Sequence, residues 1–350
     1  MRTFDYTKLK DFSWDSQIIS YIAKIQEYKG KQELYVRQKP MELKRLVEIA
    51  KIQSTEASNR IEGIITTEAR LKQLVEDKTT PRNRDEKEIL GYRNVLNIIH
   101  ESYAYIPLSA NYILQLHRDM LKFTELSYGG CFKTTPNEIA ATLPDGSKKI
   151  LFKPLEPYET PAAVEAACRS FNECLAWELV SPLLLIPCFI MDFLCIHPFN
   201  DGNGRMSRLL TLLLLYRSGY LVGRYISIEK AIADTKENYY DALYESDQNW
   251  LAEKNNPLPF IKYMLGVILS CYRDFENRIT ISEAVGEKST AYDIVKVYAE
   301  QKLGTFTKQD VVKNCPSIGQ KSVETALKRL MDEHYIKKIG AGRSTCYARI

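Results

Sequence analysis

The chain has 350 residues, of which 45% are hydrophobic and 26% charged, and its formal net charge is +4. Because this length exceeds the usual single domain, we expect two or three compact units. The composition excludes a disordered, collagenous or disulfide-stapled protein, and the charge is too small to indicate nucleic-acid binding by itself. The N-terminus lacks a signal-peptide core, and no run reaches the roughly 18 apolar residues of a membrane span. We therefore expect a cytoplasmic protein without membrane contact.

The eight cysteines form no Cys-x-x-Cys pair. Several of them fall in apolar helical patterns, which favours buried free thiols in a reducing compartment over disulfides or zinc ligation. We expect no structural metal.

Hydrophobic periodicity predicts a mainly helical fold for the first 280 residues. Apolar side chains recur at three- and four-residue steps from Met41 to Glu76, and again from Asp85 to Tyr103. Ser109 is the expected N-cap of the helix that follows. Two further helices are expected between Pro161 and Ile196, separated near Ser181-Pro182. The second, from Leu183, is apolar almost all round and should be a central buried helix.

The segment 127–157 interrupts this helical pattern. It contains Gly129-Gly130, an Asp145-Gly146 turn signal and two stretches that favour strands, Glu138 to Leu143 and Lys149 to Phe152. Together they predict a β-hairpin on an otherwise helical body.

A loop after the central helix carries the clearest chemistry. Residues 197–208 read His-Pro-Phe-Asn-Asp-Gly-Asn-Gly-Arg-Met-Ser-Arg. The run Gly202-Asn203-Gly204 frees the backbone to direct N–H groups at one point beside a helix N-terminus, which makes an anion hole for phosphate. Arg205 and Arg208, three residues apart, add donors suited to phosphate charge on one face of that helix.

Three more residues of this loop have a physical use. Asp201 is a hard oxygen ligand of the kind that Mg²⁺ prefers beside phosphates. His197 can act as a general base near neutral pH. Phe199 is expected to anchor the loop in the core.

The loop matches the signature of the Fic family, His-x-Phe-x-Asp/Glu-Gly-Asn-Gly-Arg-x-x-Arg, at every specified position. This resemblance implies that His197 deprotonates a Ser, Thr or Tyr hydroxyl of a target protein, which attacks the α-phosphate of Mg²⁺-bound ATP and expels pyrophosphate. It thus implies a protein adenylyltransferase. The alternative, a helix end followed by a plain turn, leaves two arginines and an aspartate unexplained.

A second resemblance lies upstream. The run Ser58-Asn59-Arg60-Ile61-Glu62-Gly63 resembles the inhibitory signature Ser/Thr-x-x-x-Glu-Gly/Asn of Fic proteins whose brake is an N-terminal helix. The motif residues Ser58, Glu62 and Gly63 carry this resemblance, which implies that Glu62 pairs with Arg208 and blocks seating of the γ-phosphate. A carboxylate and a phosphate compete naturally for one guanidinium. Read alone, Glu62 could be an ordinary solvated helix charge.

The resemblance extends to two weaker segments. Residues 130–152 lie where the family has its flap, a hairpin that accepts the target by strand addition, although the family often has Tyr-Arg where this chain has Phe132-Lys133. A plain surface hairpin is the alternative. Residues 236–243 resemble the segment that lines the adenine pocket, which implies contacts from Asn238 and Tyr240. Core packing of Tyr239 or Tyr240 is the other interpretation.

After residue 279 the pattern changes. Helices at 289–301 and 321–333, a segment at 307–312 between them, and a terminal hairpin at 335–349 follow the order of a winged helix-turn-helix. Six basic residues of this region could contact DNA phosphates: Lys321, Lys328, Arg329, Lys337, Lys338 and Arg343. A protein contact or a solvated face would explain the same charges.

We therefore expect a mainly α Fic helical bundle with a β-hairpin flap and a winged-helix domain, divided into an N-terminal helical region (1–105), a catalytic core (106–280) and the winged helix (286–350). Expected partners are a target protein at the flap, the protein itself through automodification, DNA, and a second copy in a homodimer. Two alternatives stay open. One is a Fic enzyme that transfers another group or removes AMP, with Glu62 positioning water. The other is a DNA-binding regulator whose nucleotide loop acts as a sensor. His100, His117 and His334 are interpreted as core or surface histidines.

Overall fold

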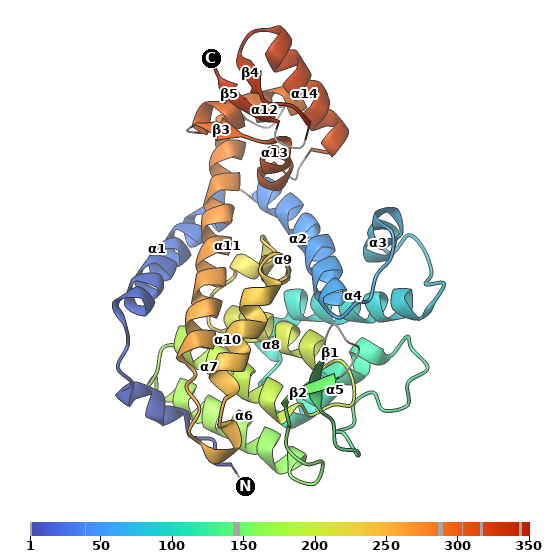
Figure 1. Cartoon of the computed structure of the whole chain (residues 1–350), viewed down its shortest axis with the longest axis vertical. Coiled ribbons are helices and arrows are strands. Elements are labelled where there is room, and N and C mark those ends of the chain that lie inside the picture. Colours follow the sequence, from blue (N-terminus) through green and yellow to red (C-terminus); the bar gives the residue numbers. More distant parts are fainter. Residues whose placement is uncertain are drawn as a thin grey trace.

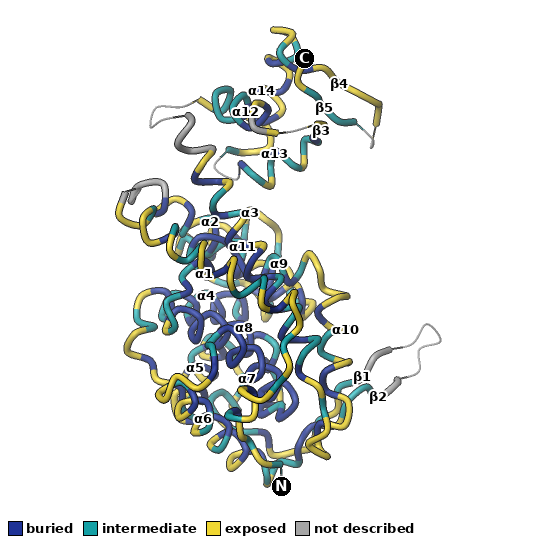
Figure 2. The backbone as a smooth tube through the Cα atoms, turned by 90° about the vertical axis from the view of Figure 1, so that its left-hand side faces the viewer, coloured by how far each residue is buried: buried dark blue, intermediate teal, exposed yellow. Residues whose placement is uncertain are grey.

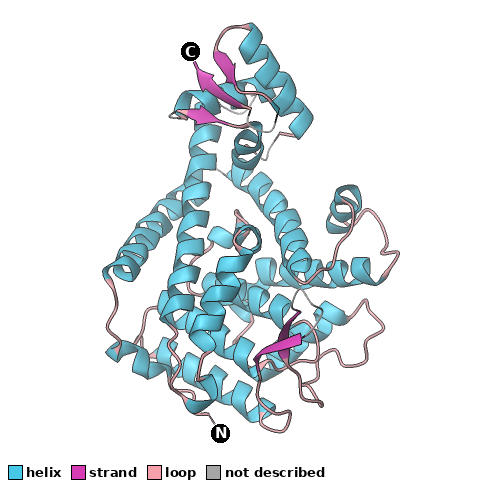
Figure 3. Ribbon diagram, in the orientation of Figure 1, coloured by secondary structure: helices cyan, strands magenta, loops and turns pink. Residues whose placement is uncertain are grey.

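The computed structural model of the chain describes residues 2–38, 40–142, 148–285, 290–302, 304–315, 318–342 and 345–350. Helices dominate these residues, and the strands form a two-stranded and a three-stranded antiparallel sheet (Figure 3). The predicted mainly helical fold is confirmed. Among the described residues, no helix combines the length and the apolar character that crossing a membrane requires.

The elements have the following bounds. The α-helices are α1 (Ser16–Gln38), α2 (Pro40–Ile61), α3 (Glu68–Val75), α4 (Arg84–Ser102), α5 (Ala110–Leu121), α6 (Thr160–Ala176), α7 (Pro182–Ile196), α8 (Asn203–Arg217), α9 (Ile228–Asp234), α10 (Lys236–Asp247), α11 (Leu258–Val285), α12 (Ala291–Gln301), α13 (Lys308–Asn314) and α14 (Gln320–Asp332). Short 3-10 helices are η1 (Tyr6–Asp11), η2 (Tyr103–Tyr105), η3 (Val222–Arg224) and η4 (Trp250–Ala252), and the strands are β1 (Ile139–Thr142), β2 (Lys148–Phe152), β3 (Thr305–Phe306), β4 (Ile336–Ile339) and β5 (Cys346–Arg349).

Helices α7 and α8 form the centre of the body (Figure 2). Every residue of α7 from Leu183 to Ile196 is buried, as its apolar sequence predicts. Helix α7 packs against α6, α8 and α11, and α8 packs against α4. One hydrophobic cluster extends from Tyr6 in η1 to Ile279 in α11. The loop that joins α7 to α8 is therefore held by the best-packed part of the molecule.

Helix α2 ends at Ile61, although the periodicity predicted a helical segment from Met41 to Glu76. Gly63 adopts a φ of +81°, a left-handed conformation that commonly stops a helix. Helix α3 starts afresh at Glu68, where the Thr67 side chain accepts a hydrogen bond from the Arg70 amide. The prediction is therefore wrong for residues 62–67, and Glu62 lies on a turn just beyond the helix.

The predicted hairpin is present as β1 and β2. The two strands pair antiparallel, with Ala140 opposite Ile150. The Asp145-Gly146 turn falls outside the described residues. Ser109 caps α5 as predicted, since its side chain accepts from the Tyr112 amide.

The C-terminal residues have a separate hydrophobic cluster, built from α12, α13, α14 and the sheet β3-β5-β4. The three helices lie where the sequence predicts them, whereas β3 was not predicted. Figure 1 shows α11 running from the body up to this unit, where Arg278 donates to the Lys313 carbonyl at 3.4 Å. The helix-and-wing assignment and the proposed domain boundaries stay predictions.

All eight cysteines are free thiols. Six are buried, as expected, but Cys131 is exposed and Cys346 is half-buried.

Candidate functional site

The loop at 197–208 is anchored in the core at its start. His197 ends α7 with φ 52° and ψ 62°, because the residue before a proline is disfavoured in the right-handed helical region. Phe199 is fully buried, and its ring stacks on His117 with centroids 3.7 Å apart. The predicted anchoring role of Phe199 agrees with this placement.

His117 holds the loop through both ring nitrogens. The Gly130 amide donates to Nδ1 at 3.1 Å, and Nε2 lies 3.1 Å from the Asp201 carbonyl oxygen. Because Nδ1 accepts, the proton belongs on Nε2, which donates to Asp201. Burial lowers the pKa of His117 to about 4, so the ring is neutral at pH 7. The sequence suggested only a core or surface histidine, and no local pattern marks this positioning role.

Asn203 and Gly202 shape the turn into α8. The Asn203 side chain accepts from the Phe199 amide at 2.9 Å and donates to the Phe199 carbonyl at 2.7 Å. Gly202 has a φ of +83°, and a Cβ there would lie 2.6 Å from Met120 Cε, so another residue would be strained and crowded. Asn203 thus binds the loop itself, and its predicted contact with phosphate stays a prediction.

The imidazole of His197 is arranged as an acceptor toward the site. Its Nδ1 lies 3.2 Å from the Leu194 carbonyl, which assigns the proton to Nδ1 and leaves the lone pair on Nε2. Burial lowers the pKa of His197 to about 4. The Leu194 carbonyl and the Glu62 charge oppose this lowering, whereas the Lys133 charge adds to it. A neutral imidazole with a free Nε2 can accept a proton from a hydroxyl.

Arg208 meets the inhibitory motif directly. Its Nε donates to Ser58 Oγ at 2.8 Å, and one terminal nitrogen donates to the Ser58 carbonyl at 2.9 Å and to Glu62 Oε1 at 2.7 Å. The guanidinium is buried, with 3% of the side chain exposed, whereas 33% of the Glu62 side chain is exposed. The structure therefore places Ser58 and Glu62 of the motif in contact with Arg208.

The Glu62 carboxylate also lies against the start of α8. A Cβ built on Gly204 would stand 2.2 Å from Glu62 Oε1 and 3.3 Å from an Arg208 nitrogen. A helix N-terminus offers free N–H groups and a positive dipole end, which favour an anion. The Glu62 carboxylate therefore lies beside the glycine turn that was predicted to bind an anion, and phosphate binding at this turn stays a prediction. Gly63 itself lies in the turn that follows, where its Cβ position is open.

Arg205 is directed elsewhere. One terminal nitrogen lies 2.7 Å from Glu88 Oε2, and the other lies 3.4 Å from Asp201 Oδ1. Only 1% of the Arg205 side chain and 3% of Glu88 are exposed. Arg84 completes the group, 2.7 Å from Glu88 Oε1 and 3.8 Å from Asp201 Oδ2. Arg205 therefore supports the loop from within, and its phosphate contact stays a prediction. The Asp201 carboxylate remains 37% exposed, so a cation can reach it.

Two further residues join the base of the hairpin to the loop. Lys133 donates its amide to the Pro198 carbonyl at 2.8 Å and its ammonium to the Ile196 carbonyl at 3.1 Å. Asn137 accepts from the same ammonium at 2.9 Å and donates to the Phe199 carbonyl at 3.1 Å. Burial lowers the pKa of Lys133 to about 8. Sequence reasoning noted Lys133 only as a departure from the family pattern.

The candidate adenine residues lie on α10. Asn238 is exposed and Tyr240 is 43% exposed, so both can contact a ligand from solvent. Tyr239 is buried, packed edge-on against Phe260 and Tyr263. Core packing thus applies to Tyr239.

The basic residues of the C-terminal unit are mostly solvated. Lys321, Lys328, Lys337 and Lys338 are exposed. Arg329 pairs with Glu333 at 2.8 Å. Arg343 lies outside the described residues. DNA binding stays a prediction.

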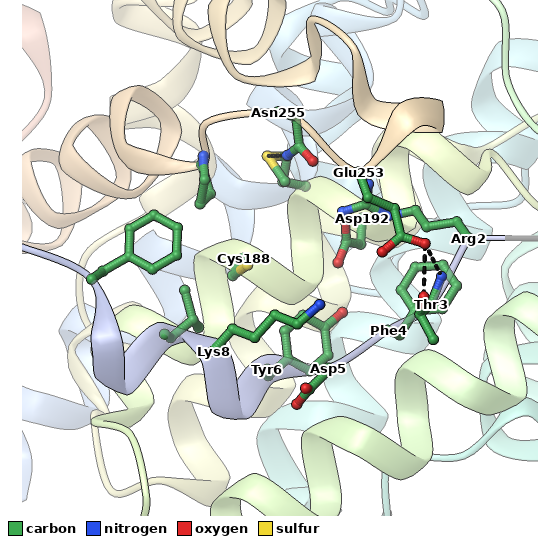
Figure 4. Close-up of a pocket in the computed structure, with 14 residues that line it drawn as sticks. Arg2, Thr3, Phe4, Asp5, Tyr6, Lys8, Cys188, Asp192, Glu253 and Asn255 are labelled. Carbon is green, nitrogen blue, oxygen red and sulfur yellow. Dashed lines mark hydrogen bonds and ion pairs between the residues drawn. The ribbon is translucent and has the colours of Figure 1, made fainter.

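A pocket beside the N-terminal segment is separate from the loop. Its lining includes Arg2 and Tyr6 from the N-terminal segment and Asp192 from α7, and no residue of 197–208. Figure 4 shows Arg2 reaching toward Asp192, and the two groups are 3.4 Å apart. This contact belongs to the packing of the N-terminal segment on α7.

Comparison with known proteins points to the same family as the loop sequence does. Residues 107–215 match the Fic/DOC family. A protein adenylyltransferase Fic from Culex quinquefasciatus is 28% identical over 232 residues, which cover 63% of this chain and 41% of that protein. Another from Nematostella vectensis is 25% identical over 186 residues, covering 51% and 40% respectively. The chain thus matches about two fifths of the length of these curated relatives.

Solved structures show the same fold. A Fic family protein from Desulfovibrio desulfuricans G20 superposes with a TM-score of 0.64 over 97% of both chains at 18% identity. A Fic domain containing signaling protein from Bacteroides thetaiotaomicron gives 0.58 at 25% identity, over 74% of this chain and 96% of that chain. The helical body therefore has the Fic fold.

Proposed function

We propose that the protein, whose residues 107–215 match the Fic/DOC family, is an adenylyltransferase that transfers AMP from ATP to a hydroxyl of a protein and is inhibited by its own Glu62. One observation carries the proposal: the buried guanidinium of Arg208 binds the carboxylate of Glu62, which lies against the start of α8 and acts on the pKa of His197. A phosphate has the charge and the oxygens to replace that carboxylate.

Several residues of the loop have a task in this reaction. The backbone of Gly202 to Gly204 and the side chain of Arg208 bind phosphate oxygens. The exposed carboxylate of Asp201 fits Mg²⁺, which commonly uses one or two carboxylates and completes its shell with phosphates and water. Bound there, the ion would neutralise phosphate charge.

His197 handles the proton. Its Nε2 accepts the proton of the target hydroxyl, and the hydroxyl oxygen forms a bond to the α-phosphorus of ATP. The bond from that phosphorus to the oxygen bridging toward the β-phosphate breaks, and pyrophosphate leaves. Positioning and charge neutralisation supply the rate acceleration, as is usual in phosphoryl transfer.

The target protein docks at the hairpin and presents its hydroxyl to the loop. In the described sheet, β1 and β2 pair only with each other, which leaves an outer edge for an added strand. Ile150 on β2 is 54% exposed and offers an apolar contact. Lys133 and Asn137 hold the base of this hairpin to the loop, so a docked segment is registered against His197.

The test uses ATP labelled at the α-phosphate, with Mg²⁺, and the full chain as both enzyme and first target. The parent protein should incorporate little label. Glu62→Gly should raise incorporation at least about tenfold. This corresponds to roughly 1.4 kcal/mol of phosphate-binding free energy that is regained when the carboxylate no longer competes for Arg208. His197→Ala in the Glu62→Gly background should abolish it.

The position of the label decides between reactions. Transfer of label from the γ-phosphate but not from the α-phosphate would indicate phosphate transfer instead of AMP transfer. Failure of Glu62→Gly to incorporate either label, with both the chain and a cell extract as target, would refute the proposal.

A further inference from the structure

The inhibitory segment has an attachment outside its own motif. The Lys236 ammonium, at the start of α10, donates to the Ile61 carbonyl at 2.8 Å. Ile61 is the last residue of α2, and Glu62 follows it directly. The last carbonyls of a helix lack donors within the helix, and a cation there is also favoured by the helix dipole. Lys236 therefore fixes the point from which the Glu62 side chain extends.

The middle of α2 is bound to the neighbouring helix α9. Ser54 donates to Glu229 at 2.7 Å, and Tyr92 from α4 donates to the other oxygen of Glu229 at 2.9 Å. These groups are fully buried, so this part of α2 is a fixed base. The end of α2 is different, because Lys236 is exposed and its bond can break without leaving a buried charge.

The position of Lys236 connects the inhibitory segment with the nucleotide side of the site. Its ammonium lies 5.7 Å from the ring centroid of Tyr240, one turn further along α10. The same side chain therefore faces both the end of α2 and a residue proposed to contact adenine.

We propose that Lys236 is a positioning residue of the autoinhibited state: its bond to the Ile61 carbonyl keeps Glu62 on Arg208. This inference rests on the proposed function, because it assigns a further determinant to the same competition between Glu62 and phosphate. When Lys236 releases the carbonyl, the turn at 62–64 loosens and the carboxylate is less often at Arg208. Inhibition then weakens although Glu62 itself is still present.

The test replaces the ammonium while keeping the length of the side chain. Lys236→Met should raise AMP incorporation about two- to tenfold, the range expected for losing one hydrogen bond. Lys236→Arg, which keeps a donor, should stay near the parent. Lys230→Met is the matched control, because Lys230 is a half-buried lysine on α9 whose ammonium pairs with Asp234. A gain of activity also separates release of inhibition from a folding defect.

A double-mutant comparison shows whether Lys236 acts through Glu62. In the Glu62→Gly background, Lys236→Met should have no further effect. An equal effect in both backgrounds would overturn the proposal. So would a Lys236→Met variant with the same rate as the parent, provided that Glu62→Gly is active.

Hydrogen exchange gives an independent measurement. The amides of Glu62 and Ile64 both donate to the Asn59 carbonyl at 3.0 Å, so their exchange reports the turn directly. Lys236→Met should accelerate their exchange, and Lys230→Met should leave it unchanged. Should Glu62→Gly prove inactive, the proposed function fails, and unchanged exchange in Lys236→Met would still refute the attachment on its own.

Discussion

Two arginines one turn apart on α8 form ion pairs of equal length with different consequences. Arg205 binds Glu88 and Arg208 binds Glu62, each with a nitrogen–oxygen distance of 2.7 Å. Both guanidinium groups are buried, but the carboxylates differ: 3% of the Glu88 side chain is exposed and 33% of Glu62. The two pairs thus differ in the carboxylate and not in the arginine, and under the proposed function only the carboxylate that reaches solvent is displaced by phosphate.

The physical reason is the fate of the carboxylate after displacement. Glu62 stands on a turn beyond a helix end, so it can move into water and recover its hydration. Glu88 lies buried inside α4, so it cannot move into water. Separation from Arg205 would leave the buried guanidinium without its main partner, which is strongly unfavourable, even though Glu88 keeps Arg84. We infer that Arg205 stabilises the loop and that Arg208 binds the phosphate of the ligand.

The largest expected effect comes from breaking the buried pair. Glu88→Ala should lower the free energy of unfolding by about 3–5 kcal/mol, because it leaves the buried Arg205 guanidinium without its main partner. Glu62→Ala should lower it by about 1 kcal/mol, since Arg208 keeps Ser58 and the lost carboxylate was partly solvated. Urea unfolding of both variants measures the difference. Glu88→Gln serves as the control that retains an acceptor. Equal losses in the two alanine variants would contradict the comparison.

The sequence alone treated the two arginines alike. The loop could be predicted because its residues are adjacent in the chain and their spacing specifies the chemistry. The link from Glu62 to Arg208 came from a second motif far upstream. Glu88 was missed because it lies in an ordinary amphipathic helix, and only the packing of α4 on α8 brings it to Arg205. The role of His117 was missed for the same reason, since it lies on α5. The role of Lys133 was missed because it lies in a segment without helix or strand, and only the folded chain brings it to the loop.

The fold shows the same division. Helix positions follow from periodicity, since an amphipathic helix repeats its signal over several turns. The end of α2 at Ile61 was missed because it depends on the single left-handed Gly63. Strand β3 has only two residues, which is too short to show an alternating pattern. The sequence thus predicts long helices well. It predicts poorly the turns that depend on one residue and the contacts between residues far apart in the chain.

A smaller effect tests whether Glu62 occupies the anion position at α8. Gly204→Ala places a methyl group where the Glu62 carboxylate lies, 2.2 Å from Oε1. The flexible carboxylate should yield, and the parent should lose up to about 1 kcal/mol of unfolding free energy with the bond to Arg208. In the Glu62→Gly background the same change should be nearly neutral, because the carboxylate is absent. Thermal or urea unfolding of the four proteins measures this coupling. A coupling of zero would place Glu62 elsewhere.

The smallest effect concerns the influence of the Glu62 charge on the pKa of His197. Burial lowers the pKa of His197 to about 4, and Glu62 opposes that shift. Removing the Glu62 charge in Glu62→Gln should therefore lower the pKa of His197 further, by a fraction of a unit for one partly solvated charge. Glu88→Gln should leave it unchanged, since the charge of Glu88 is already neutralised by Arg84 and Arg205.

Titration of the histidine ring signals by NMR measures this pKa, with His197→Ala assigning the resonance. The His197 signal should stay constant from pH 8 to about pH 5, because the ring remains neutral throughout, whereas an unperturbed histidine titrates near about 6.5. The sign follows for activity: the general base is ready over this whole range and is lost only as pH falls through about 4. A midpoint near neutrality would contradict the lowering of the His197 pKa by burial. A larger response to Glu88→Gln than to Glu62→Gln would show that Glu62 is not the carboxylate that acts on His197.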